Sequence, residues 1–192
     1  GMLRTYLPTL REWVGAQSYH VVYNSAEDGL TRETVNSRIC LKENIMLVVF
    51  TKDGNLFGSF NHKRVPPATG AGAVTDDARH FVFTLRNALG TGPLRFAPSA
   101  RNRNQLIVHD DAQTDWVLGV GFVYHLRTRG RSYVGSASGE PFDKFYANPL
   151  GLPTSLFNGT FYPQSFALAR FLVIQCVGCC RFGRPHIVGR SA

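Results

Sequence analysis

The residues best suited to hold a metal lie near the C-terminus of the chain. Cys176, Cys179 and Cys180 are close in sequence, and His186 follows them. A structural zinc site needs four ligands, and its strong sequence form is a pair of Cys-x-x-Cys knuckles. This segment has one knuckle, and Cys176 continues an apolar run, in which a cysteine behaves as a small hydrophobic residue. We therefore expect these residues to be structural and to bind no metal.

The motifs that could support catalysis are incomplete. Residues Gly135–Gly139 read Gly-Ser-Ala-Ser-Gly and resemble a nucleophile elbow, but the central residue is Ala137, so a turn is the favoured interpretation. His109 precedes Asp110 and Asp111, but adjacent residues of a strand point to opposite faces, which favours a solvated loop edge over an acid–base site. We predict that the protein is not an enzyme, because an enzyme would have to use residues scattered along this chain.

The charged feature best suited to binding is a set of arginines at alternate positions. Arg127, Arg129 and Arg131 form one such set, and Arg101 and Arg103 repeat the alternation upstream. On an extended strand, alternate residues share one face and lie about 7 Å apart. Guanidinium groups in such a row can form forked hydrogen bonds to phosphates or carboxylates. These five arginines are the candidate partner-binding or anion-binding residues, and the alternative is an edge strand that charge protects from aggregation.

The overall charge is strongly basic. The net charge is +8, and 17 of the 21 basic residues are arginine. Such a surplus favours encounters with nucleic acid, acidic proteins or anionic membrane surfaces. No dense block of basic residues accompanies it, so protein binding and nucleic-acid binding both stay open as function classes.

Length and composition indicate one globular domain in a reducing compartment. The chain has 192 residues, of which 44% are hydrophobic and 18% charged. Its longest apolar runs are strand-sized and fall short of the roughly 20 residues that span a bilayer, so no membrane insertion is expected. Four cysteines, three of them crowded together, do not make a disulfide framework. We therefore predict a cytoplasmic location.

Local patterns predict a chain of short strands with small helices. Residues Ile45–Phe50 and Asn55–Phe60 flank Asp53-Gly54, which predicts a β-hairpin with a type I′-like turn. Thr31 is expected to cap a helix over Arg32–Ile39. Further strands are predicted at 19–23, 80–85, 94–97, 105–109, 116–126 (with a bulge near its glycines), 129–134 and 171–177, a helical turn at 9–14, and a mobile loop at 64–78.

These elements predict a mainly β fold with small helices, a two-sheet antiparallel β-sandwich or a related two-sheet fold over residues 1–177, followed by a basic C-terminal tail over 178–192. Phe57, Phe60, Phe81 and Phe83 are expected to include residues that pack between the sheets. Because alternate residues of a strand share a face, Phe81 and Phe83 should point the same way.

Several of these segments resemble the TLDc domain of the oxidation-resistance proteins. Residues Tyr23–Gly29 are similar to the Tyr-x-Ser-x-x-x-Gly opening of that family, and Phe57–Phe60 to its Phe-Gly-x-Phe hairpin. Phe81–Leu85 is similar to its Phe-Val-Phe-x-Leu strand. Later segments at 121–126, 131–132 and 171–176 follow in the family's order, so the resemblance extends over residues 9–177.

The resemblance implies a two-sheet β-sandwich, a eukaryotic origin, no cofactor and no established enzymatic mechanism. It implies a role in protection against oxidative stress or in regulation of the vacuolar proton-pumping ATPase, with a protein partner such as a subunit of that pump. A nucleic-acid-binding domain that uses its arginines on DNA is the alternative. Departures from the family pattern at Gln175, Cys176 and Asp110–Leu118 mark a divergent member.

Overall fold

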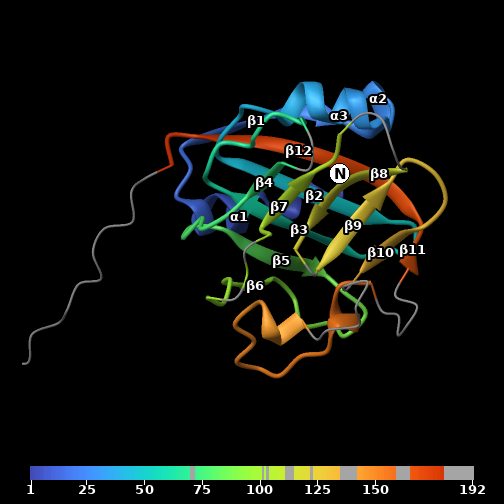
Figure 1. The fold of residues 1–192 in the computed structure, drawn as a ribbon. Helices are drawn as coiled ribbons and strands as arrows, with labels where there is room; N and C mark the ends of the chain where they lie inside the picture. The colour runs from blue at the N-terminus through green and yellow to red at the C-terminus, as the bar shows by residue number, and fades with distance from the viewer. Residues whose placement is uncertain are drawn as a thin grey trace, which may run out of the picture.

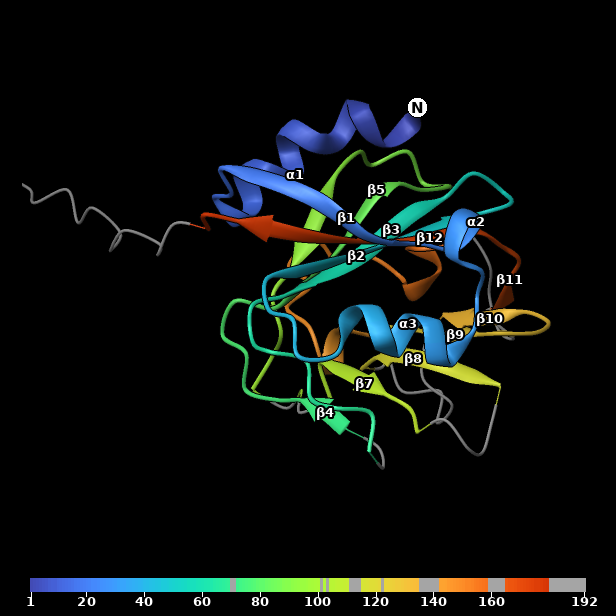
Figure 2. The same cartoon turned by 90° about the horizontal axis from the view of Figure 1, so that it is seen from above.

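The computed structural model describes residues 1–69, 72–100, 102, 104–110, 115–121, 123–134, 142–158 and 165–179. Two antiparallel sheets pack face to face, as Figures 1 and 2 show from two directions. Sheet A contains β1 (Ser18–Asn24), β12 (Leu168–Val177), β2 (Ile45–Thr51), β3 (Leu56–Asn61), β5 (Phe81–Arg86) and β6 (Leu94–Phe96), in that spatial order. Sheet B contains β11 (Ser165–Phe166), β10 (Ser132–Val134), β9 (Tyr124–Arg127), β8 (Trp116–Val120), β7 (Leu106–Val108) and β4 (Gly72–Val74), in that order. The predicted mainly β, two-sheet sandwich is confirmed.

Short helices surround the sheets. Their bounds are η1 (Met2–Tyr6), α1 (Leu7–Val14), α2 (Ser25–Asp28), α3 (Arg32–Ile39), η2 (Phe142–Lys144) and η3 (Thr154–Leu156). The helix predicted over 32–39 is confirmed, because the Thr31 hydroxyl accepts a hydrogen bond from the backbone N–H of Thr34 and so caps its first turn. Among the described residues, no helix is long and apolar enough to cross a membrane.

The β2–β3 hairpin forms where the sequence predicts it, with a different turn. Thr51 N–H donates to the Asn55 carbonyl, and Gly54 N–H donates to the Thr51 carbonyl, both at 3.0 Å. Gly54 has φ +84°, whereas Asp53 does not lie in the left-handed region. A type I′ turn needs positive φ at both central residues, so this connection is a type I turn followed by a left-handed glycine. The predicted type I′-like turn is therefore wrong, although the hairpin is right.

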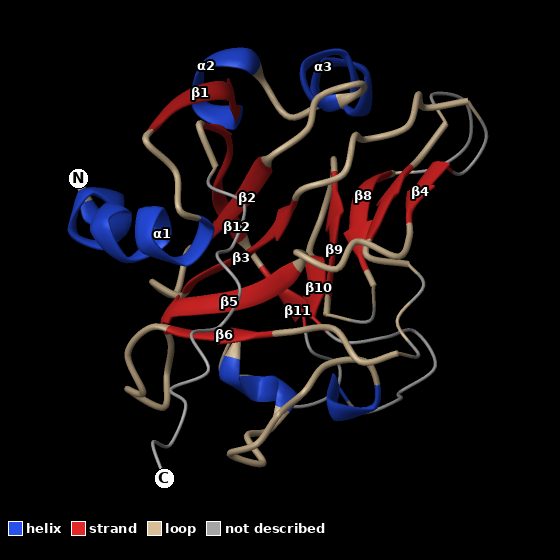
Figure 3. Cartoon of the chain, turned by 90° about the vertical axis from the view of Figure 1, so that its left-hand side faces the viewer, coloured by secondary structure: helices blue, strands red, loops and turns tan. Residues whose placement is uncertain are grey.

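Sheet A is buried on both faces, because one face packs on sheet B and the other on α1 (Figure 3). Phe57 faces sheet B, whereas Phe60, Phe81 and Phe83 belong to the cluster under α1. The Trp13 ring lies 5.9 Å from both Phe81 and Phe83, measured between ring centroids. Phe81 and Phe83 thus share a face, as expected, but this face is the outer one. Of the four phenylalanines, Phe57 is the one that packs between the sheets.

Two arginines hold α1 against sheet A. Arg95 Nη1 donates to the Trp13 carbonyl oxygen at 3.0 Å, and Arg79 Nη2 donates to the Val14 carbonyl oxygen at 3.5 Å. Carbonyls in the last turn of a helix lack intrahelical partners and carry partial negative charge. The Arg95 guanidinium also lies over the rings of Trp13 and Phe81. Cationic side chains therefore cap the C-terminal end of α1 and fix it to the sheet.

Sheet B departs from the predicted strands in three places. The strand predicted at 116–126 is a hairpin, β8–β9, whose turn is closed by a 3.0 Å hydrogen bond from Val123 N–H to the Val120 carbonyl. Gly121 is required there, since a Cβ would collide with the Asn104 carbonyl oxygen. The loop predicted at 64–78 contains β4, which pairs with β7, and the two-residue strand β11 was not predicted. Beyond residue 179, the predicted tail lies outside the described residues.

Replacing Phe81 or Phe83 with Ala tests the outer apolar layer. Both side chains are buried under α1, and we expect each substitution to lower the free energy of unfolding by roughly 3–5 kcal/mol, because it leaves a cavity. Urea denaturation of each variant measures this change. Leu89→Ala, at a side chain that is 51% exposed, is the control and should change the midpoint little. Unchanged midpoints for both phenylalanine variants would contradict this packing.

Candidate functional site

The outer face of sheet B carries a continuous row of side chains across the strands. Register pairs connect Ala73 with Ile107, Ile107 with Gly119, Gly119 with His125, His125 with Tyr133, and Tyr133 with Ser165. The neighbouring residues on these strands are buried between the sheets, so this set, the outer row, points away from the core. In Figures 1 and 2 no described helix lies over this face. Sheet B therefore presents one sheet face outward, unlike sheet A.

A group of aromatic rings surrounds Trp116 at one end of this face. The Trp116 ring lies 5.6 Å from the His125 ring, 6.1 Å from the Tyr133 ring and 6.5 Å from the His109 ring, between centroids. A Cβ at Gly119 would collide with the His125 imidazole, so the missing side chain leaves room for this ring over residue 119. We call these four rings the Trp116 cluster. They form an apolar platform with polar edges.

Two of the predicted arginines are fixed beside this cluster. Arg127 pairs in register with Trp116, its guanidinium carbon lies 5.3 Å from the centre of the indole ring, and its Nη2 lies 3.3 Å from Asp115 Oδ2. Arg131 donates from Nε to the Ser165 hydroxyl at 2.8 Å and from Nη2 to the Ser165 carbonyl at 3.0 Å. These contacts hold both guanidinium groups in defined positions.

Arg127, Arg129 and Arg131 do not form the extended row that one continuous strand would give. Strand β9 ends at Arg127, the chain turns over residues 128–130 with Gly130 at φ +72°, and β10 begins at Ser132. Because a turn breaks the two-residue alternation, Arg127, Arg129 and Arg131 do not share a strand face. They still lie together, around the β9–β10 hairpin, with Arg129 exposed in the turn. Arg101 and Arg103 lie outside the described residues.

The histidines of the Trp116 cluster have lowered pKa values. Burial lowers the pKa of His125 to about 4, with a further contribution from nearby His109. Burial and the positive charge of Arg32 lower the pKa of His109 as well. Arg32, from α3, also donates to the Trp116 carbonyl at 3.3 Å. At neutral pH the positive charge of this surface therefore comes from arginines, while the histidines act as neutral rings.

The most deeply buried of the described histidines, His80, lies in the core. His80 Nδ1 is 2.8 Å from the Phe60 carbonyl oxygen, and its Nε2 is 2.8 Å from the Tyr146 hydroxyl. A carbonyl can only accept, so Nδ1 donates to Phe60 and Nε2 accepts from the Tyr146 hydroxyl. Burial lowers the pKa of His80 to about 4. Both ring nitrogens are engaged, which makes this pair a structural link between the sheet and the segment around Tyr146.

The structure leaves parts of the metal and catalytic predictions untested. Among the described residues, no group of three or more His, Cys, Asp or Glu side chains could hold a metal ion. Cys180, His186, Asp111 and residues 135–139 lie outside the described part of the chain. The predictions that these residues bind no metal and perform no catalysis therefore stay predictions.

A family model of the TLDc domain matches residues 1–150. The chain belongs to the TLDc domain family. The match includes β1 to β10 and therefore the Trp116 cluster and all five predicted arginines. Strands β11 and β12 lie beyond the match. No curated protein was found to be similar to the chain. Membership of the TLDc family is consistent with a role related to oxidative stress.

Sequence reasoning named the arginines of this TLDc domain but missed the aromatic cluster beside them. His109 was considered for acid–base chemistry with Asp110, and Trp116, His125 and Tyr133 were not singled out. The two-residue alternation of this strand could have placed His125 on the same face as Arg127, since both flank buried Leu126. The contact of Trp116 with the other rings depends on strand register, which a local pattern does not specify.

The lowered pKa values predict a loss of stability in mild acid. His80 and His125 titrate near pH 4 in the folded TLDc domain and near 6.5 when unfolded, so between these values the unfolded chain binds more protons. The free energy of unfolding should therefore fall as the pH is lowered from about 6.5 to 4, by at most about 1.4 kcal/mol per pH unit for each histidine. Urea denaturation at a series of pH values measures this slope.

The variant His125→Asn separates this effect from general acid sensitivity. It removes one of the buried titrating groups and should therefore reduce the pH dependence of the free energy of unfolding. Equal pH dependence in the wild type and His125→Asn would show that His125 is not a buried neutral ring.

Proposed function

We propose that this TLDc domain is a non-catalytic protein-interaction domain, and that it binds an acidic protein partner on the outer face of sheet B. The observation that carries the proposal is the placement of Trp116 and Tyr133 beside the arginines of the β9–β10 hairpin, on a face that no described helix covers. Trp, Tyr and Arg are the residue types most enriched at the energetic centres of protein interfaces.

The charges of this surface favour an acidic partner. Arg127, Arg129 and Arg131 lie around one hairpin, and Asp115 is the carboxylate that pairs with Arg127. Complementary charge speeds association and disfavours basic partners. The contacts of Arg127 with Trp116 and of Arg131 with Ser165 also hold these side chains before binding, which reduces the entropy lost when a partner arrives.

The environment of the histidines supports a binding role better than a catalytic one. A general base is normally oriented by a carboxylate, whereas His109 lies near Arg32, and His125 lies near His109 and the Trp116 ring. In the core, both nitrogens of His80 are hydrogen-bonded within the protein. These histidines are placed as neutral rings that build a surface or a core.

Family membership supports a cellular context for this binding. We propose that the partner belongs to the oxidative-stress response or is a cytoplasmic subunit of the vacuolar proton-pumping ATPase, and that the TLDc domain acts in the cytoplasm. An acidic surface segment on such a partner would meet the β9–β10 hairpin, with an apolar side chain on the Trp116 cluster.

Nucleic-acid binding is the second candidate function, and the net charge of +8 favours it. The distribution of the described arginines favours it less. Arg79 and Arg95 bind the end of α1 beside sheet A, and Arg170 donates to the Asn24 side chain at 2.9 Å. Phosphate binding needs a continuous basic surface, whereas these three arginines are engaged in contacts within the fold.

The arginine variant Arg127→Ala/Arg129→Ala/Arg131→Ala tests both functions. We expect wild type to bind a fluorescein-labelled peptide of Asp, Glu and Phe residues, and the triple variant to lose roughly tenfold or more in affinity, about 1.4 kcal/mol, because it loses the complementary charge. Fluorescence anisotropy measures this binding. A variant with Arg4, Arg38 and Arg64 replaced by Ala removes the same charge from exposed positions elsewhere and should bind like wild type.

The same measurement with a random DNA duplex at several salt concentrations distinguishes the two candidates. Phosphate contacts give an affinity that falls linearly with salt on logarithmic axes, with a slope set by the number of contacts. We expect weak duplex binding that is equal in the wild type and the triple variant. Sub-micromolar duplex affinity near physiological salt that the triple variant loses would replace protein binding with nucleic-acid binding as the function.

A further inference from the structure

The thiols of Cys176 and Cys179 are in contact at the end of β12. Cys176 is buried on the α1 side of sheet A, and Cys179 packs against the same apolar cluster while remaining partly exposed. The two side chains are hydrogen-bonded to each other. Burial, with a smaller contribution from the contact with Cys179, raises the pKa of the Cys176 thiol to about 12, as expected when Cys176 keeps its proton and donates it.

The backbone between the two cysteines brings their side chains together. Val177 is fixed by a 3.0 Å hydrogen bond from Gln17 N–H to its carbonyl, and Gly178 follows with φ +68°. A left-handed residue reverses the direction of the chain at low cost only when it is glycine. Cys179 consequently returns toward Cys176 instead of continuing along the strand. A disulfide requires Cα atoms within about 7 Å and Cβ atoms that point toward each other, and the reversal at Gly178 is the feature that favours this arrangement.

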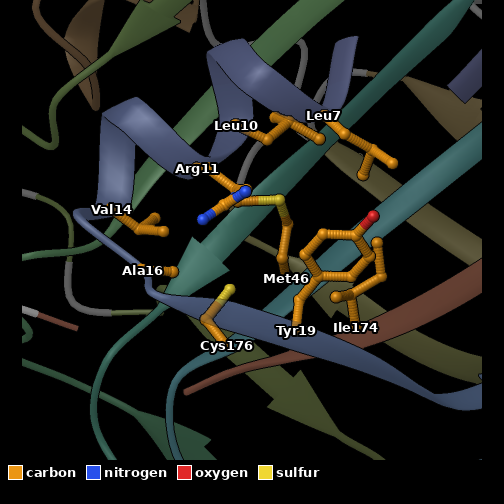
Figure 4. A pocket seen from close by; sticks show the side chains of 9 residues that line it. All are labelled: Leu7, Leu10, Arg11, Val14, Ala16, Tyr19, Met46, Ile174 and Cys176. Atoms are coloured by element: carbon orange, nitrogen blue, oxygen red, sulfur yellow. The ribbon is translucent and has the colours of Figure 1, made fainter. Parts of the chain in front are cut away.

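The two thiols differ in their exposure to solvent, because Cys176 is buried and Cys179 is partly exposed. Figure 4 shows Cys176 beside Ala16 and Met46 in a narrow crevice between α1 and sheet A. The crevice has a volume of about 10 Å³, close to the space that one water molecule needs. The narrow crevice leaves little room for larger reagents around Cys176, whereas the Cys179 side chain is partly exposed.

We infer that Cys176 and Cys179 form a dithiol that peroxide oxidises to an intramolecular disulfide. Cys179 Sγ attacks one oxygen of hydrogen peroxide, the O–O bond breaks, and one water leaves as Cys179 becomes a sulfenic acid. Cys176 Sγ then attacks the Cys179 sulfur, the S–O bond breaks, and the hydroxide takes the Cys176 proton and leaves as a second water. The two thiols lose two electrons in total, and the peroxide is reduced to two waters.

The geometry assigns the order of these steps. Cys179 is the thiol that peroxide meets first, because it is the more exposed of the two. Cys176 is the resolving thiol, and its raised pKa makes disulfide closure slower than it would be for an exposed cysteine. A small dithiol reductant reverses the reaction by thiol–disulfide exchange at the exposed Cys179 sulfur.

Alkylation and intact mass of the full chain test this inference. After peroxide treatment and removal of the oxidant, we expect the number of cysteines that iodoacetamide labels in denaturant to fall from four to two, with the loss of two hydrogens from the intact mass. Dithiothreitol should restore all four. Cys40→Ser and Cys180→Ser are the matched controls, and each should retain the disulfide, since Cys40 lies at the end of α3 and neither belongs to the contacting pair.

The variants Cys176→Ser and Cys179→Ser should not form the disulfide, and in Cys176→Ser the oxidised Cys179 should persist as a sulfenic acid that dimedone traps. Cys179→Ser keeps the buried core intact, so its failure to form the disulfide remains informative even if Cys176→Ser unfolds. Loss of the disulfide in Cys180→Ser, four labelled cysteines after peroxide, or stoichiometric zinc on the purified protein would each overturn the inference.

Discussion

The burial of sheet A on both faces is the constraint on which the rest of this TLDc domain depends. Strands β2 and β3 are almost entirely buried, because their alternate side chains pack on sheet B and on α1 in turn. The second face needs a cover, and α1 supplies it, with Arg79 and Arg95 bonded to its last carbonyls. Sheet B has one buried face, and its other face is therefore the one available for binding.

Arginine consequently serves two purposes in this domain, a structural one beside sheet A and a proposed binding one beside sheet B. Beside sheet A, arginines satisfy helix carbonyls and lie over aromatic rings of the fold itself. Beside sheet B, Arg127 and Arg131 are held at a hairpin next to Trp116 and Tyr133. The large positive charge of the chain is thus a poor guide to its function, because part of that charge is structural.

Local signals in the sequence predicted local structure well. The turn residues around Gly54 located the β2–β3 hairpin, and Thr31 located the start of α3, because each acts through neighbours in the chain. Alternation correctly placed Phe81 and Phe83 on one face, but it could not say which layer would cover them. The three hairpin arginines do not share a strand face, because the left-handed backbone of Gly130 turns the chain between them. The Trp116 cluster was not predicted, because it depends on the register between neighbouring strands.

Site-specific photo-crosslinking most directly tests whether the outer face of sheet B is the interaction surface. A photoreactive phenylalanine analogue would replace Tyr133 in one version of the full chain and Leu89, exposed between β5 and β6 of sheet A, in another. The account predicts a discrete protein adduct in the native cell from position 133, lost when the three hairpin arginines are replaced by Ala, and none from position 89. Adducts from position 89 alone, or crosslinks from position 133 to nucleic acid, would contradict it.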